Sequence, residues 1–178
     1  MKTEIKKMKL HLGCGNNYMK GYINCDYTNK VKVDKIVNLE KKLPFEDNSI
    51  DEIYSRNTFE HINDFMGLMK ELYRICKPDA KLTIIVPYFS HYGAFQDPTH
   101  KRFFALRTFD YFDSKNSFSY YSDVRFKVIS KRLTSFVRHK KTSKILDKMI
   151  NFNQNIYERL FSGIFPAEEL TFILEVKK

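Results

Sequence analysis

A glycine-rich turn and one aspartate near the start of the chain form a pattern that could hold a nucleotide. Gly13-Cys14-Gly15 directly follows a short apolar run, and Asp26 ends the next apolar run 11 residues further on. Glycine lets the backbone approach a ligand closely, and a carboxylate that ends the second strand accepts hydrogen bonds from ribose hydroxyls. The spacing therefore predicts a nucleotide site at the end of the first strand.

The same turn excludes two common classes of nucleotide-binding protein. The dinucleotide fingerprint needs a third glycine at position 18, which is Tyr18, and it needs an acid about 20 residues further on. The chain contains no Gly-Lys-Ser or Gly-Lys-Thr sequence, so it has no P-loop. A nicotinamide-dependent enzyme and a P-loop nucleotide hydrolase are therefore not expected.

The elements that must position these residues alternate as they do in a parallel α/β sheet. Residues 65–76 place apolar side chains at helical spacing, and Asn63 or Asp64 can begin this helix. The run 81–87 is apolar throughout, which is typical of a parallel strand covered on both faces. Further short strands are expected at residues 9–12, 21–26, 35–39 and 50–55.

The last third of the chain is expected to add two strands and one long helix. The strands occupy residues 126–133 and 170–176, and the helix runs from about residue 143 to residue 161 between them. This long connection allows an antiparallel return, and without a repeat or linker residues 1–178 are expected to form a single domain. The apolar face of the helix, for which core or dimer packing is expected, consists of Ile145, Met149, Phe152, Ile156 and Leu160.

Several segments together carry a family resemblance. They are residues 10–16, 21–26, 43–51, 59–62, 72–78, 82–87 and 97–104. Within residues 8–112 they resemble the class I S-adenosylmethionine-dependent methyltransferases, especially the small bacterial type-11-like members. The resemblance implies a Rossmann-like α/β fold with a mostly parallel seven-stranded sheet and an antiparallel last strand. The short spacing between Asn16 and Gly21 implies a shortened first helix.

The resemblance also implies S-adenosylmethionine as the cofactor. The glycine turn would hold its methionine end, Asp26 its ribose and the pair Asn38-Leu39 its adenine, while residues 55–59 line the other side. His11 and Asn38 depart from the family pattern, which usually has acids at these two positions. The cofactor-binding residues implied in this way are His11, Gly13, Cys14, Gly15, Asn16, Asp26, Asn38, Leu39 and Asn57.

Methyl transfer to a hydroxyl or an amine also requires that a proton be removed. His61, His91 and His100 are the candidate bases, because the acceptor pocket is expected after the fourth and fifth strands. Asp97, His91 and His100 could instead bind a metal ion, but Asp97-Pro98 is more typical of a turn, and no metal is predicted.

The expected acceptor is a small molecule or a sugar or glycan precursor. Residues 100–148 carry 13 Lys and Arg against four Asp, and 13 of the 27 Phe and Tyr lie between Tyr88 and Phe126. Lys101 and Arg102 could meet an anionic acceptor in a pocket at residues 88–107.

Two alternatives to this function stay open. The basic segment could also meet RNA, and an RNA methyltransferase is the first alternative. However, no proline follows Asn57 and no cysteine follows a proline, so the motifs of base methylation are missing and no stable nucleic-acid binding is expected. The second alternative is a non-catalytic S-adenosylmethionine-binding protein of the same fold, which the two departures at His11 and Asn38 favour.

The remaining sequence features concern the compartment. Three scattered cysteines do not form a disulfide framework, and no apolar run reaches the 18 or so residues of a membrane span. The first residues lack the apolar stretch of a signal peptide. We therefore expect a cytoplasmic protein without a membrane span, with a homodimer left open.

Overall fold

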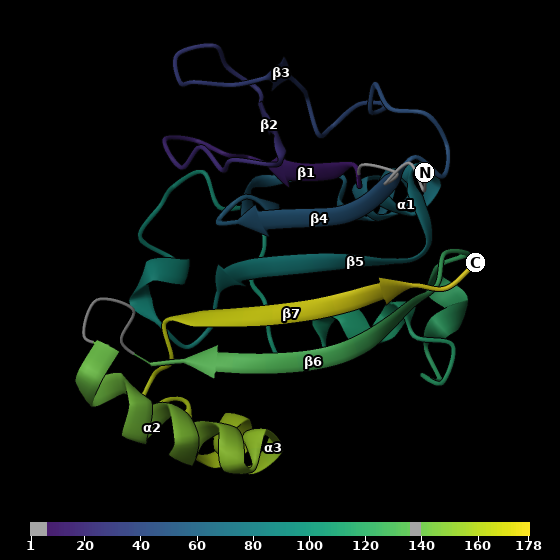
Figure 1. Ribbon diagram of the computed structural model, residues 1–178. Coiled ribbons are helices and arrows are strands. Elements are labelled where there is room, and N and C mark those ends of the chain that lie inside the picture. Colours follow the sequence, from purple (N-terminus) through teal and green to yellow (C-terminus); the bar gives the residue numbers. More distant parts are fainter. Residues whose placement is uncertain (1–6, 136–139) are drawn as a thin grey trace, which may run out of the picture.

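The computed structural model describes residues 7–135 and 140–178, which fold around one seven-stranded sheet (Figure 1). The strand order is β3-β2-β1-β4-β5-β7-β6, and β7 runs antiparallel to both of its neighbours while the pairs among β1 to β5 are parallel. This confirms the expected α/β fold. The strands are β1 (Lys9–Leu12), β2 (Ile23–Asp26), β3 (Lys35–Ile36), β4 (Ile50–Arg56), β5 (Cys76–Pro87), β6 (Phe126–Thr134) and β7 (Glu169–Val176).

The carboxyl ends of β1, β4 and β5 lie along one edge of the sheet, at the left of Figure 1. Ligands of parallel α/β sheets bind beyond this edge, because the loops that leave the strands there can surround them. The loops that follow β1, β4 and β5 are therefore the ones that build the candidate site.

Helix α1 (Phe65–Ile75) forms as its sequence predicts. Asp64 caps its first turn by accepting a 2.8 Å hydrogen bond from the Gly67 amide. The apolar positions at helical spacing form one stripe of the helix, which is buried against the sheet because burial there removes it from water. They are Phe65, Leu68, Met69, Leu72 and Ile75.

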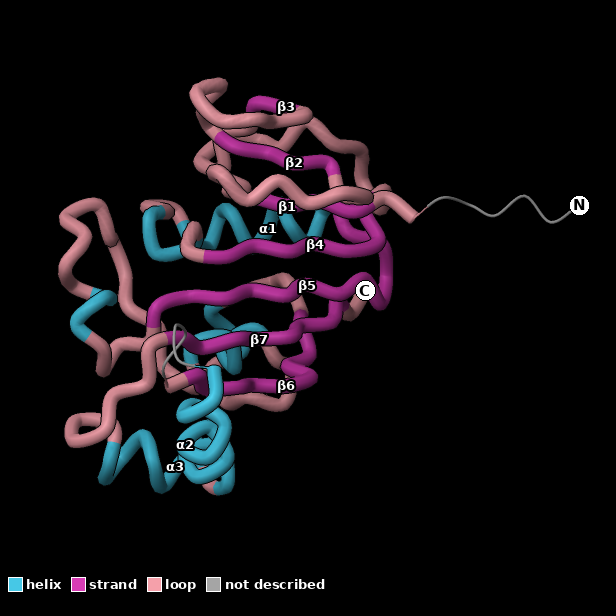
Figure 2. The backbone as a smooth tube through the Cα atoms, turned by 60° about the vertical axis from the view of Figure 1, so that its left-hand side comes forward, coloured by secondary structure: helices cyan, strands magenta, loops and turns pink. Residues whose placement is uncertain are grey.

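One face of the sheet is covered and the other is not. Along β5, the buried side chains of Leu82, Ile84 and Val86 alternate with partly exposed ones, and β7 shows the same alternation. In Figures 1 and 2 α1 lies behind the sheet, and among the described residues no helix lies in front of β4, β5 and β7. The expectation that both faces of β5 are covered is therefore wrong.

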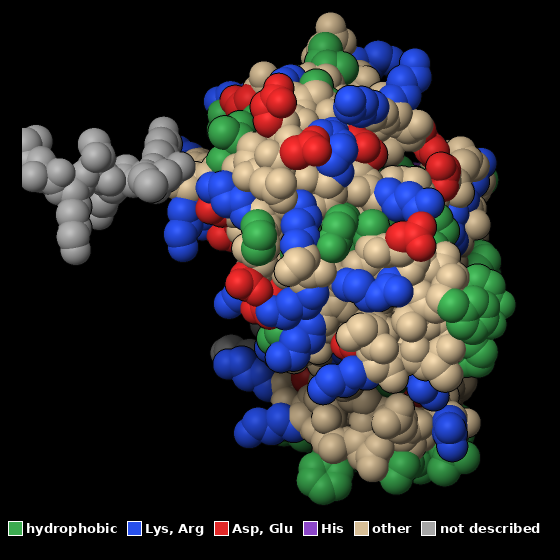
Figure 3. All heavy atoms as spheres, turned by 90° about the vertical axis from the view of Figure 1, so that its right-hand side faces the viewer, with side chains coloured by type: hydrophobic (Ala, Val, Ile, Leu, Met, Phe, Trp, Pro, Cys, Tyr) green, Lys and Arg blue, Asp and Glu red, His purple; other side chains and the backbone are tan. Residues whose placement is uncertain are grey.

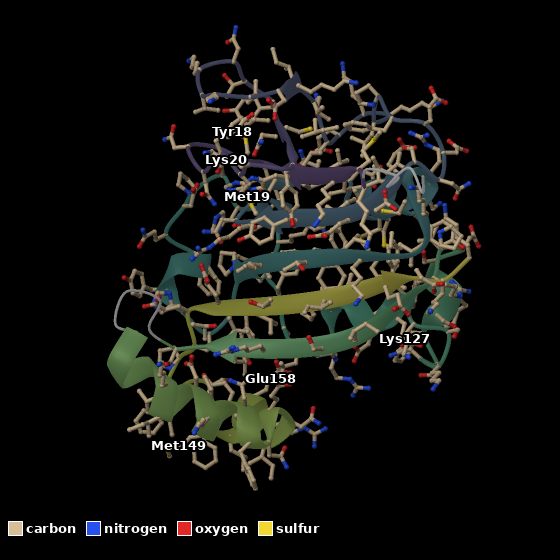
Figure 4. The ribbon with its side chains drawn as sticks, in the orientation of Figure 1. Tyr18, Met19, Lys20, Lys127, Met149 and Glu158 are labelled. Carbon is tan, nitrogen blue, oxygen red and sulfur yellow. The ribbon has the colours of Figure 1, made fainter. Side chains whose placement is uncertain are left out.

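The shortened first helix is not formed. Residues 13–22 run as turns and extended chain, in the loop that contains the labelled Tyr18, Met19 and Lys20 of Figure 4. Asn24 in β2 holds this loop: its Nδ2 donates to the carbonyls of Met19 and Tyr22 at 3.0 Å each, and its Oδ1 accepts from the Met19 amide at 2.8 Å. The Asn24 side chain forms hydrogen bonds with backbone groups that would pair with one another in a helix, so this segment does not become helical.

The single helix expected at residues 143–161 is broken into three pieces. They are α2 (Lys140–Phe152), α3 (Gln154–Ile156) and the π-helix η5 (Tyr157–Phe161). The break lies at Asn153, whose Oδ1 accepts a 3.1 Å hydrogen bond from the Ile156 amide. Asparagine favours such a cap over a helix interior, so the chain restarts its helix there.

Helix α2 docks on the sheet with polar residues. Asn151 accepts a hydrogen bond from the Leu133 amide at 2.9 Å and donates one to the Leu133 carbonyl at 2.8 Å, while Asp147 Oδ1 accepts from the amide and the hydroxyl of Ser135. Strand β6 is the edge of the sheet, and its outer backbone groups need partners. The side chain of Asn151 pairs with this edge as a neighbouring strand would.

The apolar face that was expected in the core is therefore turned outward. Phe152 is 92% exposed, and Figure 4 shows Met149 on the side of α2 away from the sheet. The expectation of core packing is wrong, and the homodimer remains a prediction. The exposed positions are Ile145, Met149, Phe152, Ile156 and Leu160.

Five of the 13 aromatic residues between Tyr88 and Phe126 are buried in the core: Tyr88, Phe104, Phe109, Phe112 and Phe126. Phe104, Phe109 and Phe112 each meet Phe65 of α1 edge to face, with ring centroids 5.6–5.9 Å apart. These contacts attach the long segment after β5 to the covered face of the sheet, and their aromatic character reflects packing rather than ligand binding.

Candidate functional site

A cavity of about 560 Å³ opens where β1, β2 and β4 end, a volume typical of small-molecule sites. Six of the nine expected cofactor residues line it: Gly13, Gly15, Asp26, Asn38, Leu39 and Asn57. His61, a candidate base, also lines it. Thr58, from the segment 55–59 expected on the other side of the cofactor, and Thr99, from the expected acceptor segment 88–107, line it as well. The remaining lining residues, which sequence reasoning did not single out, are Cys25, Tyr27, Val37, Glu40 and Ile62.

The turn after β1 brings Gly13 against the loop that follows β4. Gly13 and Gly15 have positive φ angles of 65° and 48°. A Cβ atom on Gly13 would lie 2.1 Å from Oγ1 of Thr58, whereas a Cβ on Gly15 would meet nothing within 4 Å. Gly13 is therefore required by the contact between the two loops, and Gly15 by its backbone conformation.

Asp26 ends β2 with its side chain against the same turn. Its Oδ2 accepts a 2.9 Å hydrogen bond from the amide of Gly15. The residue is only 8% exposed but lines the cavity, and no described residue donates a hydrogen bond to its Oδ1. That oxygen is available to the hydroxyls of a ribose.

The residues after β3 form another wall of the cavity. Oδ1 of Asn38 accepts a 2.9 Å hydrogen bond from the amide of Glu40. Glu40 in turn accepts hydrogen bonds from the amides of Asn63 at 2.6 Å and Asp64 at 3.2 Å, just before α1. The Asn63 amide, followed by the Asp64 amide, lowers the pKa of Glu40 and stabilises its charge. This wall is thus tied to the start of α1.

Asn57 turns the chain at the end of β4. Its φ angle of 51° is rare outside glycine, and its amide donates to the carbonyl of Ile85 at 2.9 Å. Left-handed residues of this kind cluster at functional sites. The turn exposes Asn57 and Thr58 to the cavity and leads directly into the 3-10 helix η1 (Phe59–His61).

Three of the expected cofactor residues do not line the cavity. His11 is buried in β1, where its Nδ1 donates to Oδ1 of Asn24 at 3.2 Å and its ring packs edge-on against Tyr54. Burial lowers the pKa of His11. Cys14 is also buried, and Asn16 is exposed on the loop. His11 and Cys14 therefore support the walls of the site from behind.

Glu60 on η1 is the residue that sequence reasoning missed. It is only 1% exposed, and neither oxygen of its carboxylate has a hydrogen-bond partner among the described residues. Burial raises the pKa of Glu60 to about 7, because the charged form loses its hydration. No local pattern signals this burial, although Glu60 stands in the Phe-Glu-His-Ile segment that carries the resemblance.

Glu60 shares its site with two of the three candidate bases. The rings of His61 and His100 meet edge to face with centroids 4.8 Å apart, and Nε2 of His100 lies 4.0 Å from Oε1 of Glu60. One nitrogen of each histidine and one carboxylate oxygen of Glu60 lie within 4.8 Å of one another. Burial, followed by the charge of His100, lowers the pKa of His61, so this ring can accept a proton near neutral pH.

The third candidate base lies apart from this cluster. Nδ1 of His91 accepts a 3.1 Å hydrogen bond from the Gly93 amide and caps the short helix η2 (Tyr92–Ala94). Of the proposed acceptor segment 88–107, Thr99 is the described residue that lines the cavity. Arg102 donates to the carbonyls of Ile62 and Asn63, so it holds the two loops together.

The arrangement combines two chemical abilities. The glycine turn and Asp26 offer backbone groups and a carboxylate to a nucleotide, and the cluster of Glu60, His61 and His100 offers groups that accept a proton or a metal ion. His61 belongs to both, since it lines the cavity and joins the cluster. A second molecule bound between them would meet both sets of groups.

Comparisons with known proteins agree with this geometry. Residues 10–84 match the protein family described as "Methyltransferase domain". The search of curated proteins finds no match.

Solved structures share the fold over nearly the whole chain at low sequence identity. The YcgJ protein of Bacillus subtilis has a TM-score of 0.62 at 17% identity, covering 97% of this chain and 92% of its own. An S-adenosylmethionine-dependent methyltransferase of Archaeoglobus fulgidus has a TM-score of 0.57 at 18% identity, covering 95% and 86%. A further one, from Mesorhizobium loti, has a TM-score of 0.60 at 12% identity, covering 94% and 90%.

Proposed function

We propose that this chain, which has the fold and the domain match of a class I S-adenosylmethionine-dependent methyltransferase, methylates a small molecule. The methyl group would go to a hydroxyl or an amine. S-adenosylmethionine is the cofactor of this fold. The observation that carries the proposal is that His61 lies both on the cofactor cavity and in the cluster with Glu60 and His100. A sugar or glycan precursor is the acceptor class we favour.

The residues present fit the cofactor. Positive φ angles at Gly13 and Gly15 bring backbone to the cavity, and Asp26 keeps Oδ1 available for the ribose. Asn38 and Leu39 line the cavity after β3, where the adenine would lie. Bound there, the cofactor supplies a methyl group on a sulfonium, which reacts by in-line displacement once the acceptor is aligned with it.

The chain's own residues would then position the acceptor and remove its proton. Alignment of the two reactants supplies most of the rate in such a displacement. The proton of a hydroxyl or amine would pass to a ring nitrogen of His61 or to Nε2 of His100, which lies 4.0 Å from Oε1 of Glu60. His100→Ala should therefore lower turnover by about 10²–10⁴-fold while leaving cofactor affinity nearly unchanged.

RNA methylation is the second candidate, because the net charge is +10. Figure 3 shows the side of the molecule opposite the strand ends that build the site, and there Lys and Arg are mixed with Asp and Glu instead of forming one basic field. We expect weak, sequence-blind binding to RNA and DNA that is lost near physiological salt. Tight binding to one RNA at that salt would reverse the order of the two candidates.

The experiment that tests the proposal has two stages. S-adenosylmethionine is first titrated into the protein by calorimetry, and a methyl-labelled cofactor is then offered with sugar phosphates, nucleotide sugars, small amines and RNA. Transfer to a small hydroxyl or amine is expected. If the cofactor does not bind, only the assignment of the fold would stand. Binding without transfer to any acceptor would favour the non-catalytic alternative.

None of the helices in residues 7–135 and 140–178 is long and apolar enough to cross a membrane. The cytoplasmic address and the single-domain organisation remain proposals from the sequence.

A further inference from the structure

The hydrogen bonds around His100 determine which of its ring nitrogens carries the hydrogen. Nδ1 lies 2.8 Å from the carbonyl oxygen of Ala94. A carbonyl can only accept, so Nδ1 must be the nitrogen that donates. In the neutral ring Nε2 then has a bare lone pair, and this is the atom that lies 4.0 Å from Oε1 of Glu60.

His61 is oriented in the same way by Thr99. Oγ1 of Thr99 lies 2.7 Å from Oδ1 of Asp97, and because a carboxylate can only accept, the hydroxyl hydrogen belongs to that bond. The 2.9 Å contact between Oγ1 of Thr99 and Nδ1 of His61 then requires the ring to donate. Nε2 of His61 therefore also has a bare lone pair.

In its charged form, Glu60 completes a set of three groups that accept hydrogen bonds and do not donate. Both of its carboxylate oxygens are buried without a partner, and one ligand atom of each residue lies within 4.8 Å of the others. Lone pairs that face one another repel, and burial removes the water that would separate them. The group that would satisfy all three is a cation.

We propose that Glu60, His61 and His100 bind one divalent transition-metal ion, a site beyond the cofactor binding and methyl transfer proposed above. Two imidazoles and one carboxylate suit Zn²⁺, Fe²⁺ or Co²⁺, whereas Mg²⁺ and Ca²⁺ prefer oxygen ligands. Ligand atoms about 2.1 Å from a tetrahedral ion lie about 3.4 Å apart. The 4.0 Å separation between Oε1 of Glu60 and Nε2 of His100 would therefore shorten by about 0.6 Å. No two ligand atoms are more than 4.8 Å apart, so no pair needs to approach by more than about 1.4 Å, which side-chain rotation can supply.

The surroundings of the two histidines match those of metal ligands. A metal-binding histidine usually donates its other ring N–H to a backbone carbonyl or to a carboxylate-linked group, which fixes its orientation. Ala94 does this for His100, and Thr99 with Asp97 does it for His61. Oδ2 of Asp97 lies 4.0 Å from Nε2 of His100, so this carboxylate adds negative charge beside the proposed ion.

The position of this ion would give it a role in choosing the acceptor. His61 and Thr99 line the cofactor cavity, so the ion would lie at its edge. Three protein ligands leave an open position, as in catalytic zinc sites. If the proposed methyl transfer holds, that position would take the hydroxyl oxygen of the acceptor and lower its pKa. With the ion bound, His61 and His100 would act as its ligands, and the ion would take over the activation of the acceptor that was assigned above to a free ring nitrogen. The substrate class would then be a hydroxyl compound able to coordinate a metal.

The test measures metal binding without S-adenosylmethionine. Tag-free protein is dialysed against EDTA and then against metal-free buffer, and is titrated with Zn²⁺ alone by calorimetry. One ion per chain is expected. Loss of an outer partner of a metal ligand costs about 10–100-fold in affinity, so Glu60→Gln and His100→Ala should each weaken binding by at least about 100-fold. Co²⁺ should give visible absorption bands that both variants lose.

His91→Ala is the matched control, because His91 lies on the same loop as His100 but outside the cluster, and it should retain wild-type zinc affinity. Circular dichroism and thermal unfolding establish that each variant is folded. Absence of stoichiometric zinc binding in the wild type would overturn the metal site. Glu60 would then be protonated, and its proton would take the place proposed for the metal ion. Binding that survives both substitutions would overturn it as well. Zinc binding without cofactor binding would leave the metal site standing while the proposed function fails.

Discussion

The backbone amide of Gly15 donates a 2.9 Å hydrogen bond to Oδ2 of Asp26. This contact joins the turn after β1 to the end of β2, and it uses one carboxylate oxygen while the other stays available. The side chain that holds the glycine turn is therefore the same one for which we propose recognition of a ribose.

Asp26→Ala should weaken the binding of S-adenosylmethionine. Loss of charge-assisted hydrogen bonds to the ribose is worth about 2–3 kcal/mol, or roughly 30- to 150-fold in affinity. Calorimetric titration measures the change. The control is Lys20→Ala, an exposed position on the loop between β1 and β2, which should leave the affinity unchanged. Equal affinities of Asp26→Ala and the wild type would show that the ribose lies elsewhere.

Gly13→Ala should destabilise the fold more than Gly15→Ala does. Both positions have positive φ, which costs a side chain about 1–2 kcal/mol, but only the new Cβ at Gly13 would meet Thr58, at 2.1 Å. Thermal unfolding of the two variants measures the difference. From the sequence, the need for glycine at this position follows from the close approach of a ligand, whereas in the structure an added Cβ would meet Thr58 first.

A double variant separates these two causes. The three atoms nearest the new Cβ all belong to the side chain of Thr58, so Gly13→Ala with Thr58→Gly should be less destabilised than the sum of the single changes. The remaining loss should resemble that of Gly15→Ala. Additive effects would mean that the two loops do not touch in solution.

His11 should make the stability of the protein fall as the pH falls. Burial lowers its pKa in the folded state below 6.5, so the unfolded chain takes up the proton first when the pH drops. The contribution is therefore complete above about pH 6.5 and is lost below it. His11→Gln should show a smaller fall in Tm between pH 7.5 and pH 5.5, and parallel curves for the two proteins would contradict this.

Asn151→Ala should be strongly destabilising although asparagine is polar. The substitution removes both hydrogen bonds to Leu133 and leaves an edge-strand amide and carbonyl unpaired, which should cost about 2–3 kcal/mol. Met149→Ala on the same helix should change stability by less than about 0.5 kcal/mol, because Met149 is exposed. Denaturant unfolding compares the free energies of unfolding of the two variants. A larger loss for Met149→Ala than for Asn151→Ala would mean that the apolar face of α2 is packed in the core after all.

Local patterns in the sequence were sufficient for α1 and for most strands in the first half of the fold, although not for the loop between β1 and β2. Helix α1 follows from the spacing between Phe65 and Ile75 and from the cap at Asp64, all within 12 residues. The glycine turn and Asp26 lie on neighbouring strands, so their spacing along the chain already limits how far apart they can be. Propensity, spacing and turn chemistry act over such short separations.

The acid-histidine cluster depended on the tertiary structure. His61 follows β4 and His100 follows β5, and they meet because these two strands are neighbours in the sheet. The sequence offered His61 and His100 as separate candidates and added His91, which instead caps η2. No local pattern indicates that the carboxylate of Glu60 is buried without a partner.

The last third of the chain shows the same division. The apolar stripe that contains Ile145 and Met149 has the period of a packed helix, yet Asn151 faces the sheet. That outcome depends on the order of the strands, because β6 lies at the edge and its unpaired backbone groups bind a polar side chain. The sequence by itself determined most of the strands, α1 and the glycine turn after β1. The strand order decided which polar groups meet, since burial and unpaired backbone depend on neighbours that are distant in the chain.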